Sequence, residues 1–318
     1  MASMRIAMPN TLIDSPLALY IKLGEAGSRE KECIENGTLH LGYAELPHEL
    51  CLAGRWQEAE QLALTFSKDR GAATRHINQV RRFYEEPPTT LWITFYGDTL
   101  WWCFAQARID LLPGNTKLRH AIDGWHNCDV AGHPLRKFLL SGKLLATQGF
   151  QGTICAVADR DYLLRKINGI IEPRVAEAQQ ALLALAAALV PIIKRLHPKD
   201  LEILTDLIFR QAGWNRTGVA GGIERDIDLD LLSPLTNERV AVQIKSRASK
   251  QEYDDYRSKY SVMPGFKRFY FVTHSPTDEL ESAAKEEEDK TYIFWGPQKL
   301  AEYAARHGLV GWLIDKAN

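Results

Sequence analysis

The sequence lacks the features that assign a function from composition alone. Its 39 Lys and Arg residues and 40 Asp and Glu residues nearly cancel, so the formal net charge is −1 and the chain has no overall basic character. A nucleic-acid partner would therefore have to bind at local basic patches. With 318 residues, 45% of them hydrophobic and 25% charged, the composition is that of a globular protein with two domains.

Cysteine is scarce as well. The five cysteines are scattered and no two form a CxxC pair, which argues against a zinc ribbon and against a disulfide framework. The first residues also lack the basic and then apolar pattern of a secretion signal. We therefore expect a reducing, cytoplasmic location.

Long apolar runs are missing too. The longest, residues 181–193, falls short of the roughly 18 or more apolar residues of a spanning helix, and it contains Pro191. We expect a buried or inter-domain helix here and no membrane partner. No HExxH, GxSxG or P-loop signature is present, which removes three common classes of catalytic site.

What the chain does contain is an acidic strand followed by a strand with an amide and a lysine. Asp226, Asp228 and Asp230 alternate with apolar residues, so the pattern predicts that they share one face of a strand. After a turn, Gln243 and Lys245 share a face in the same way. The spacing between Asp228 and Gln243 suits two adjacent strands.

These residue types suit a metal-dependent phosphodiester hydrolase. Mg²⁺ takes oxygen ligands and keeps several waters, and Asp228, the side-chain oxygen of Gln243 and the backbone carbonyl of Ile244 can supply oxygens. Lys245 would orient or deprotonate the attacking water, or offset charge in the transition state. We expect Mg²⁺ as cofactor, with Mn²⁺ as an alternative. The competing interpretation is a solvated acidic edge strand.

The same residues resemble the PD-(D/E)xK nuclease superfamily, specifically its Mrr-like restriction endonuclease branch, in which Gln replaces an acid of the motif. The similarity rests on the helix at residues 201–204, the loop at 221–228 and the strand at 242–245, and it covers about residues 195 to 300. It implies a restriction-endonuclease-like α/β sandwich with a central mixed sheet. It also implies hydrolysis of DNA that leaves 5′-phosphate and 3′-hydroxyl ends.

The resemblance assigns roles to individual residues. Asp228 takes the position of the catalytic metal ligand, Glu224 that of an earlier acid, and Glu202 that of a helix acid near the site. Asp226 stands where the family carries glycine, so it remains a rival to Asp228 as the ligand. The predicted catalytic residues are Asp228, Gln243, Lys245 and Glu202, and the predicted metal ligands are Asp228, Gln243 and Ile244.

The first half of the chain combines basic and aromatic residues. Arg81 and Arg82 fall on a predicted helix over residues 71–84, and a predicted hairpin over residues 91–105 carries Trp92, Trp101 and Trp102. Such a set suits base stacking beside phosphates, and it resembles EVE/PUA-like domains, which read modified bases. Trp101 and Trp102 must point to opposite faces, and the alternative is that these aromatics form a core.

We therefore predict an α/β protein with an N-terminal recognition domain over residues 1–170, either mixed α/β or a PUA/EVE-like barrel, beginning with a loosely structured lead-in over residues 1–30. A helical linker over 171–196 and a nuclease domain over 197–318 would follow. The predicted substrate contacts are Asp226, Glu224, Ser246, Arg247 and Lys250, together with Trp92, Trp101, Trp102, Arg81 and Arg82.

The expected function is Mg²⁺-dependent cleavage of double-stranded DNA, modified or foreign, in restriction and antiviral defence. Because cleavage of both strands needs two sites, we expect a homodimer or a higher oligomer. Two alternatives stay open: a nucleic-acid-binding sensor with a catalytically silent nuclease fold, and a nuclease directed at RNA.

Overall fold

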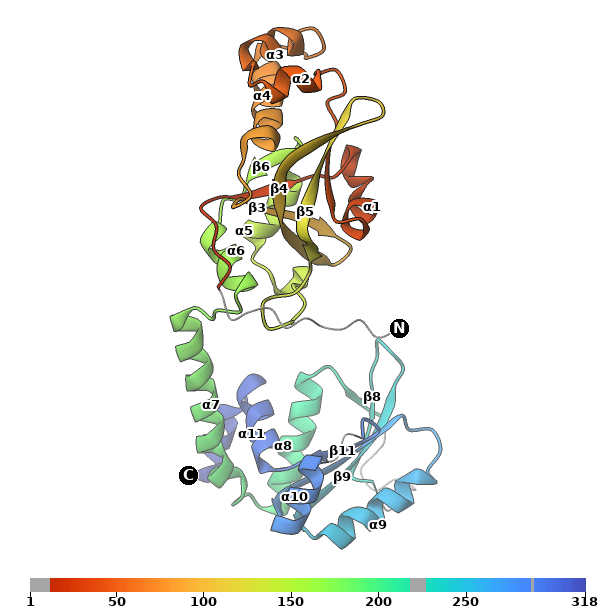
Figure 1. The fold of residues 1–318 in the computed structure, drawn as a ribbon. Coiled ribbons are helices and arrows are strands. Elements are labelled where there is room, and N and C mark those ends of the chain that lie inside the picture. The colour runs from red at the N-terminus through yellow and green to blue at the C-terminus, as the bar shows by residue number, and fades with distance from the viewer. Residues whose placement is uncertain (1–11, 218–226, 287–288) are drawn as a thin grey trace. The chain divides into compact units, whose positions relative to one another are not determined.

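The computed structural model describes residues 12–217, 227–286 and 289–318, and the chain divides into two compact units, Met1–Glu172 and Pro173–Asn318 (Figure 1). Each unit combines helices with one sheet that has both parallel and antiparallel neighbours. The predicted α/β class is therefore confirmed.

The sheet of the first unit has the order β2-β5-β4-β3-β1-β6. Its strands are β1 (Ala18–Ile21), β2 (Thr38–Leu41), β3 (Leu91–Tyr96), β4 (Thr99–Leu112), β5 (Thr116–His126) and β6 (Ile154–Ala156). The predicted hairpin is present as β3 and β4, which pair antiparallel across a turn where Gly97 has a φ of 57°. Glycine suits this turn because it adopts a positive φ without steric cost.

The predicted loose lead-in is wrong where the structure describes it. β1 lies between β3 and β6 in the sheet, and all four of its residues are buried. A strand that is buried on both faces shows no alternation of polar and apolar residues, so its periodicity is silent in the sequence.

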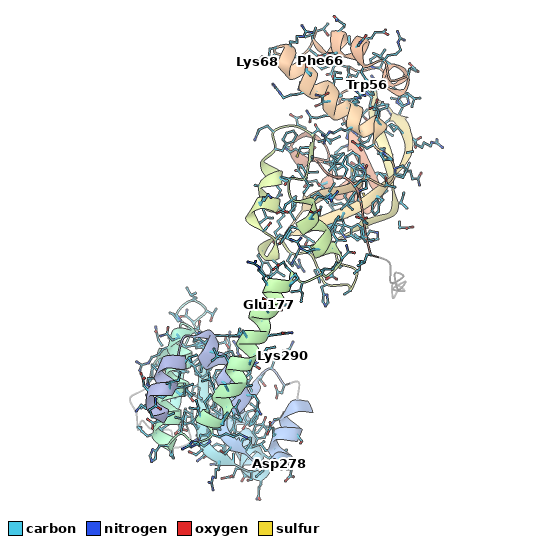
Figure 2. All side chains as sticks on the ribbon, turned by 90° about the vertical axis from the view of Figure 1, so that its left-hand side faces the viewer. Trp56, Phe66, Lys68, Glu177, Asp278 and Lys290 are labelled. Atoms are coloured by element: carbon cyan, nitrogen blue, oxygen red, sulfur yellow. The ribbon has the colours of Figure 1, made fainter. Side chains whose placement is uncertain are left out.

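The helices of the first unit are α1 (Glu30–Glu35), α2 (His48–Leu52), α3 (Trp56–Ala63), α4 (Arg70–Glu85), α5 (Gly142–Leu145) and α6 (Arg160–Ile167). Figure 2 shows Trp56 and Phe66 in the group formed by α2, α3 and α4. The N-cap of α4 is Asp69, whose side chain accepts a hydrogen bond from the Ala72 N–H. Its apolar face, with Ile77, Val80 and Phe83, packs into the core on one side of the sheet.

The sheet of the second unit has the order β11-β10-β9-β8-β7. Its strands are β7 (Asn215–Arg216), β8 (Leu229–Leu232), β9 (Arg239–Ala248), β10 (Arg268–Pro276) and β11 (Tyr292–Trp295). β9, β10 and β11 run parallel, whereas β8 is antiparallel to β9. The predicted mixed sheet is thus present.

Helices cover both faces of this second sheet. They are α7 (Pro173–Ile193), α8 (Pro198–Gln211), α9 (Lys250–Ser261), α10 (Asp278–Glu286), α11 (Pro297–Arg306) and α12 (Val310–Ala317). Leu229, Val242 and Ile244 share a core with α7, α8, α11 and α12. Ala241 and Phe271 point to the opposite face and share a second core with α9 and α10. The result is a three-layer sandwich.

Helix α7, predicted as a buried or inter-domain helix, is buried along one face only. It packs into the core of the second unit through Ala186, Leu189 and Ile193, but Leu183 is 65% exposed and most of its other apolar side chains are also accessible. By length and composition alone, this 21-residue helix is long and apolar enough to cross a membrane. Only one of its faces belongs to the core.

Candidate functional site

The ladder between β8 and β9 places Asp228 opposite Gln243. Leu229 pairs with Val242, and the N–H of Asp228 donates to the Val242 carbonyl at 3.0 Å. Because side chains alternate along a strand, Asp228 and Gln243 then share the face that is opposite to buried Leu229 and Val242. Lys245 lies two residues further along β9 and points to that same face.

The carboxylate of Asp228 is held by two hydrogen bonds from β9. Its Oδ2 accepts from Gln243 Nε2 at 2.7 Å and from the backbone N–H of Ile244 at 2.6 Å. In the described register β8 pairs with β9 only as far as Val242, and beyond that point the carboxylate takes the place of a backbone acceptor. The side chain is therefore fixed by the backbone of the strand that carries Gln243 and Lys245.

Partial burial makes this carboxylate more basic than a solvated aspartate. The pKa of Asp228 is raised, mainly because burial disfavours the charged form, and Glu202 raises it further. The Ile244 N–H, Lys245 and Lys199 act in the opposite direction. A partly desolvated carboxylate of this kind gains more from a nearby cation than a solvated one does.

Gln243 presents an oxygen that has no partner. The side chain is 4% exposed, and its Oε1 is buried without a hydrogen bond in the described structure. Which end of an amide faces Asp228 follows from the hydrogen-bond network, so a half-turn of the amide would bring Oε1 to the Asp228 side. Such a turn is unfavourable against a bare carboxylate and favourable when a cation lies between the two oxygens.

These donors fit a hard divalent cation. The N–H and the carbonyl of one strand residue point the same way, so the Ile244 carbonyl faces the side on which Asp228 lies. Among the described residues no three His, Cys, Asp or Glu side chains gather as a metal site. A cation here would therefore be held by one carboxylate together with amide and carbonyl oxygens, which Mg²⁺ accepts when waters complete its shell.

Lys245 is held beside an aromatic ring. Its Nζ lies 5.2 Å from the centre of the Tyr256 ring on α9, and Lys259 approaches the same ring at 4.9 Å. A cation over a ring face is attracted by about 0.5–1 kcal/mol at exposed sites. The sequence interpretation missed Tyr256, although the spacing of Tyr253, Tyr256 and Tyr260 already indicates that this face of α9 turns to the sheet.

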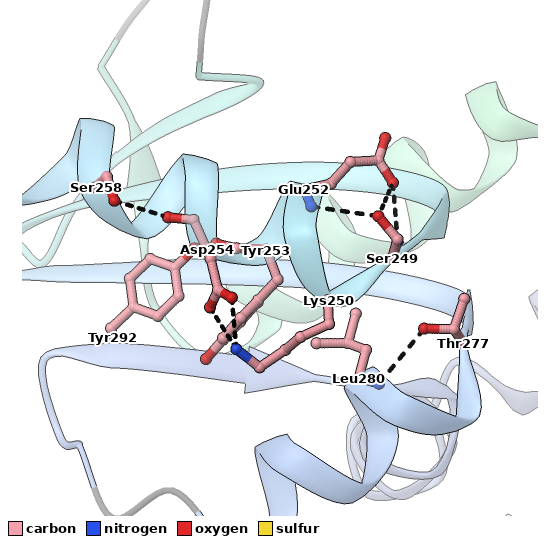
Figure 3. A network of polar contacts seen from close by, with 9 residues as sticks. All are labelled: Ser249, Lys250, Glu252, Tyr253, Asp254, Ser258, Thr277, Leu280 and Tyr292. Atoms are coloured by element: carbon pink, nitrogen blue, oxygen red, sulfur yellow. Dashed lines mark hydrogen bonds and ion pairs between the residues drawn. The ribbon is translucent and has the colours of Figure 1, made fainter.

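The start of α9 is built by local polar contacts (Figure 3). Ser249 and Glu252 form a capping box at its N-terminus. Lys250, a predicted phosphate contact, instead has its ammonium 2.6 Å from both carboxylate oxygens of Asp254. Arg247 is exposed and Ser246 half-buried, so Arg247 is the more accessible of the predicted contacts in this segment.

Glu202 lies on α8, on the other side of the sheet from α9. Its carboxylate forms an ion pair with Lys199 at 2.7 Å. It influences the charge of Asp228 from there, and no direct contact between the two is described. The structure therefore places Glu202 near the site, whereas Asp228, Gln243 and Lys245 converge on it.

The other acids of the predicted acidic strand and the loop before it do not share the surroundings of Asp228. Asp230 is bound by Arg239 through two hydrogen bonds of 2.9 and 2.5 Å, which lower its pKa. Glu224 and Asp226 lie outside the described residues. The three aspartates are thus not equivalent, and Asp228 is the one whose place beside Gln243 is described.

The tryptophans proposed as pocket residues belong to the cores. Trp92 is fully buried against Phe83, and Trp102 is 3% exposed with its indole N–H bonded to the Cys128 carbonyl at 2.9 Å. Trp101 packs against the core that contains Trp92, with its indole nitrogen buried. Trp92 and Trp102 are too buried to stack on a ligand, so their assignment as substrate contacts is corrected.

Arg81 and Arg82, the two arginines predicted as substrate contacts, have different surroundings. Arg81 is exposed and pairs with Glu85 on the same helix at 2.6 Å. Arg82 lines a small cavity with Arg75 and Asn78. One guanidinium nitrogen of Arg82 is buried without a hydrogen-bond partner in the described structure.

Comparison with known proteins finds a family match within the second unit. Residues 193–304 match the family model Mrr_cat, described as a restriction endonuclease. No curated protein matches the chain.

Among solved structures, the "DNA modification-dependent restriction endonuclease AspBHI" is 13% identical, with 94% of this chain and 84% of that chain covered and a TM-score of 0.30. The "MspJI Restriction Endonuclease in Complex with 27-mer Oligonucleotide" is also 13% identical, with 89% and 74% covered and a TM-score of 0.23. Scores this low do not demonstrate a common fold. The family match, together with the site geometry, identifies residues 193–304 as a restriction endonuclease domain of the Mrr_cat family.

Proposed function

We propose that the second unit hydrolyses phosphodiester bonds of DNA at a divalent-cation site centred on Asp228. The observation that carries this proposal is the joint attachment of the Asp228 carboxylate to Gln243 and to the Ile244 N–H, with Lys245 next in the strand. One half-buried carboxylate, one unpartnered amide oxygen and one lysine on the same face are the groups that such a reaction needs.

Asp228, Gln243 and Ile244 would hold the cation, Mg²⁺ or Mn²⁺. When bound, it would polarise the scissile phosphate and lower the pKa of a coordinated water. The protein's own contribution is placement: the hydrogen bond from the Ile244 N–H fixes the carboxylate, and the Gln243 amide turns its oxygen inward. Lys245 would place its ammonium beside the phosphate, where it offsets the additional negative charge of the transition state.

Two neighbours would adjust this centre without entering it. Glu202 adds negative potential near Asp228, which favours cation binding. Tyr256 restricts the positions that the Lys245 ammonium can adopt. Arg247 is exposed just beyond the site and can contact a flanking phosphate.

At the level of the whole protein, the first unit would select the DNA and the second would cut it, as in restriction of modified or foreign DNA during antiviral defence. The substrate would be double-stranded DNA, and cleavage of both strands would require two copies of the chain. Action of this kind would take place in the cytoplasm.

A plasmid-nicking assay tests the catalytic proposal. Wild-type protein is compared with Asp228→Ala and Lys245→Ala, in EDTA and in Mg²⁺. The controls are Asp315→Ala and Lys299→Ala, which remove an exposed aspartate and an exposed lysine of the same unit. We expect nicking only with Mg²⁺, a loss of about 10²-fold or more in the two site variants, and near-normal rates in the controls.

Unchanged nicking in both site variants, or nicking that persists in EDTA, would overturn the assignment. DNA binding without any cleavage by the wild type would favour the sensor alternative. Parallel reactions with RNA separate a deoxyribonuclease from a nuclease directed at RNA.

A further inference from the structure

An arginine outside the predicted motif reaches the residue at the centre of the nuclease site. Arg216 belongs to β7, the strand at one edge of the second sheet, and its Nη2 donates to the Asp228 carbonyl at 3.2 Å. The ladder partner of Arg216 is Leu231. The side chain of Arg216 therefore extends along β8, past Leu229, to reach Asp228.

Arg216 and Lys245 approach Asp228 from opposite faces of the sheet. Residues that pair across two strands share a face, and Leu231 belongs to the core that includes α7 and α8, so Arg216 lies on that face. Lys245 lies on the other face, beside Tyr256 of α9. Two positively charged side chains thus flank the aspartate.

The two polar ends of Asp228 are held by different strands. Its carboxylate accepts hydrogen bonds from Gln243 and Ile244 of β9. Its backbone carbonyl accepts a hydrogen bond from Arg216 of β7. Within the part of the chain that the structure describes, Arg216 forms no ion pair with Asp228 or with any other acid. The charge of this guanidinium is therefore not compensated by the residues around it.

Most of the hydrogen-bonding capacity of Arg216 is also unused. A guanidinium carries five N–H donors in a planar fork, and the bond described for Arg216 goes to a neutral carbonyl. The side chain is half-buried. Arg268, the other half-buried arginine among the described residues of this unit, pairs with Glu238 at 2.5 Å. Because partial burial of an unpaired cation is unfavourable, Arg216 favours an anion that comes from outside the chain.

A phosphate group of DNA fits this position. The fork of a guanidinium binds two oxygens of one phosphate at once, which an ammonium cannot do. Lys199, on helix α8 of the same face, is already paired with Glu202 at 2.7 Å, so Arg216 offers the less compensated charge. A DNA strand whose scissile phosphate lies at Asp228 carries its next phosphate one nucleotide away, beside a group that is bonded to the Asp228 backbone.

We propose that Arg216 binds the phosphate next to the scissile one, from the α8 face of the sheet, while it keeps its hydrogen bond to the Asp228 carbonyl. This rests on the proposed function in one respect, that the phosphate belongs to DNA held at the Asp228 centre. One side chain would then connect the DNA backbone to the residue that holds the cation.

The test counts phosphate contacts through the salt dependence of DNA binding. The full chain is titrated into a fluorescein-labelled duplex at several KCl concentrations, in EDTA, so the measurement does not depend on cleavage. The slope of log Kobs against log[KCl] becomes shallower by about 0.9 for each phosphate contact that is lost. The variants are Arg216→Gln and Arg216→Lys. The matched control is Arg306→Gln, which removes an exposed arginine of the same unit.

We expect Arg216→Gln to bind the duplex about tenfold more weakly, with a slope shallower by about 0.9. Arg216→Lys should keep the wild-type slope, because an ammonium still neutralises one phosphate. Arg306→Gln should match the wild type in affinity and slope. In plasmid nicking with Mg²⁺, Arg216→Gln should raise KM about tenfold and change kcat less, since a flanking contact is made in the ground state and in the transition state alike.

Thermal unfolding separates phosphate binding from a structural role. If Arg216 only supports the Asp228 backbone, Arg216→Gln lowers the melting temperature and leaves the salt slope unchanged, and that result overturns the proposal. A slope as shallow in Arg216→Lys as in Arg216→Gln also overturns it, because the positive charge would then not be what the DNA contacts.

The phosphate contact and the proposed function fail in different ways. An unchanged slope in Arg216→Gln, together with loss of nicking in Asp228→Ala, overturns the phosphate contact and leaves the nuclease assignment intact. A shallower slope in Arg216→Gln, together with undiminished nicking in Asp228→Ala and Lys245→Ala, overturns the cation site and supports a phosphate contact at Arg216.

Discussion

Replacing Gln243 by glutamate tests the geometry of the nuclease centre without using activity. Gln243 Nε2 donates to Asp228 Oδ2 at 2.7 Å, so Gln243→Glu puts a carboxylate oxygen where a donor stood. Loss of a hydrogen bond to a charged group costs about 1.5–3 kcal/mol. Two unit charges at this separation repel by about 6 kcal/mol at an effective dielectric constant of 20.

Proton uptake limits that repulsion, because the pair can keep one proton between its two carboxylates. We therefore expect a net loss of about 2–4 kcal/mol at pH 7.5 in EDTA, which lowers the melting temperature of the second unit by about 10 °C. In the folded variant, repulsion between the two carboxylates raises the pKa of the pair. The stability deficit of the variant should therefore shrink as the pH falls from 7.5 to 5. Mg²⁺ should raise the melting temperature more in the variant than in the wild type.

Differential scanning calorimetry at both pH values, with and without Mg²⁺, provides the measurement. Gln298→Glu is the matched control, since Gln298 is exposed on α11. Equal deficits at pH 7.5 and pH 5 would refute the adjacency of residues 228 and 243. A deficit that disappears at pH 5 but does not respond to Mg²⁺ would refute the cation site while leaving the adjacency intact.

Three further outcomes follow from the same contacts. The raised pKa of Asp228 means that ionisation of this carboxyl weakens the folded state. The wild type should therefore lose stability relative to Asp228→Asn as the pH rises from 3.8, the ordinary pKa of the Asp228 carboxyl, through its raised pKa in the folded state. Urea unfolding over that pH range measures the difference. Tyr256→Phe should keep nicking activity because the ring that attracts Lys245 remains, whereas Tyr256→Leu should lower the rate several-fold with little change in melting temperature. Lys117→Met should cost about 1.5–3 kcal/mol in urea unfolding, because the carbonyls of Tyr43 and Leu46 lose the ammonium donor and each keeps one other donor, the Leu46 N–H and Asn115 Nδ2 respectively.

The adjacency of Asp228 and Gln243 in the candidate site could be predicted because its determinants are local. Alternating residues and a short turn place Asp228 opposite Gln243, and the register bears this out. The prediction could not foresee that β8 begins at Leu229, which leaves Asp228 at the end of the ladder with its carboxylate bonded to the Ile244 N–H. Nor could a strand pattern show that Arg239 donates hydrogen bonds to both carboxylate oxygens of Asp230.

The first unit was less predictable because its determinants are distant in sequence. β1 and β2 have four residues each and are fully buried, so neither shows the alternation by which a strand is recognised. The first unit also contains a cavity of about 380 Å³, and its lining residues range from Lys22 to Thr153 along the chain. No sequence spacing relates these residues. The aromatic content of the first half predicted Trp92 as a binding residue, whereas Trp92 is buried in the core. The aromatic residues that line the cavity are Tyr43, Phe66 and His76.

A glutamine in place of an acid changes the energetics of the nuclease site. A second buried acid beside Asp228 would add repulsion of several kcal/mol in the absence of a cation, and the fold would then depend on metal binding. Gln243 avoids that repulsion by donating to Asp228 and leaves one unpartnered oxygen, Oε1, as the residual cost, about 1–3 kcal/mol. The cation is attracted by one formal charge fewer, so its binding should be weaker than at a two-acid site. If the proposed cation binds here, the glutamine that would lower its affinity also lets Asp228 and Gln243 take up their positions without it.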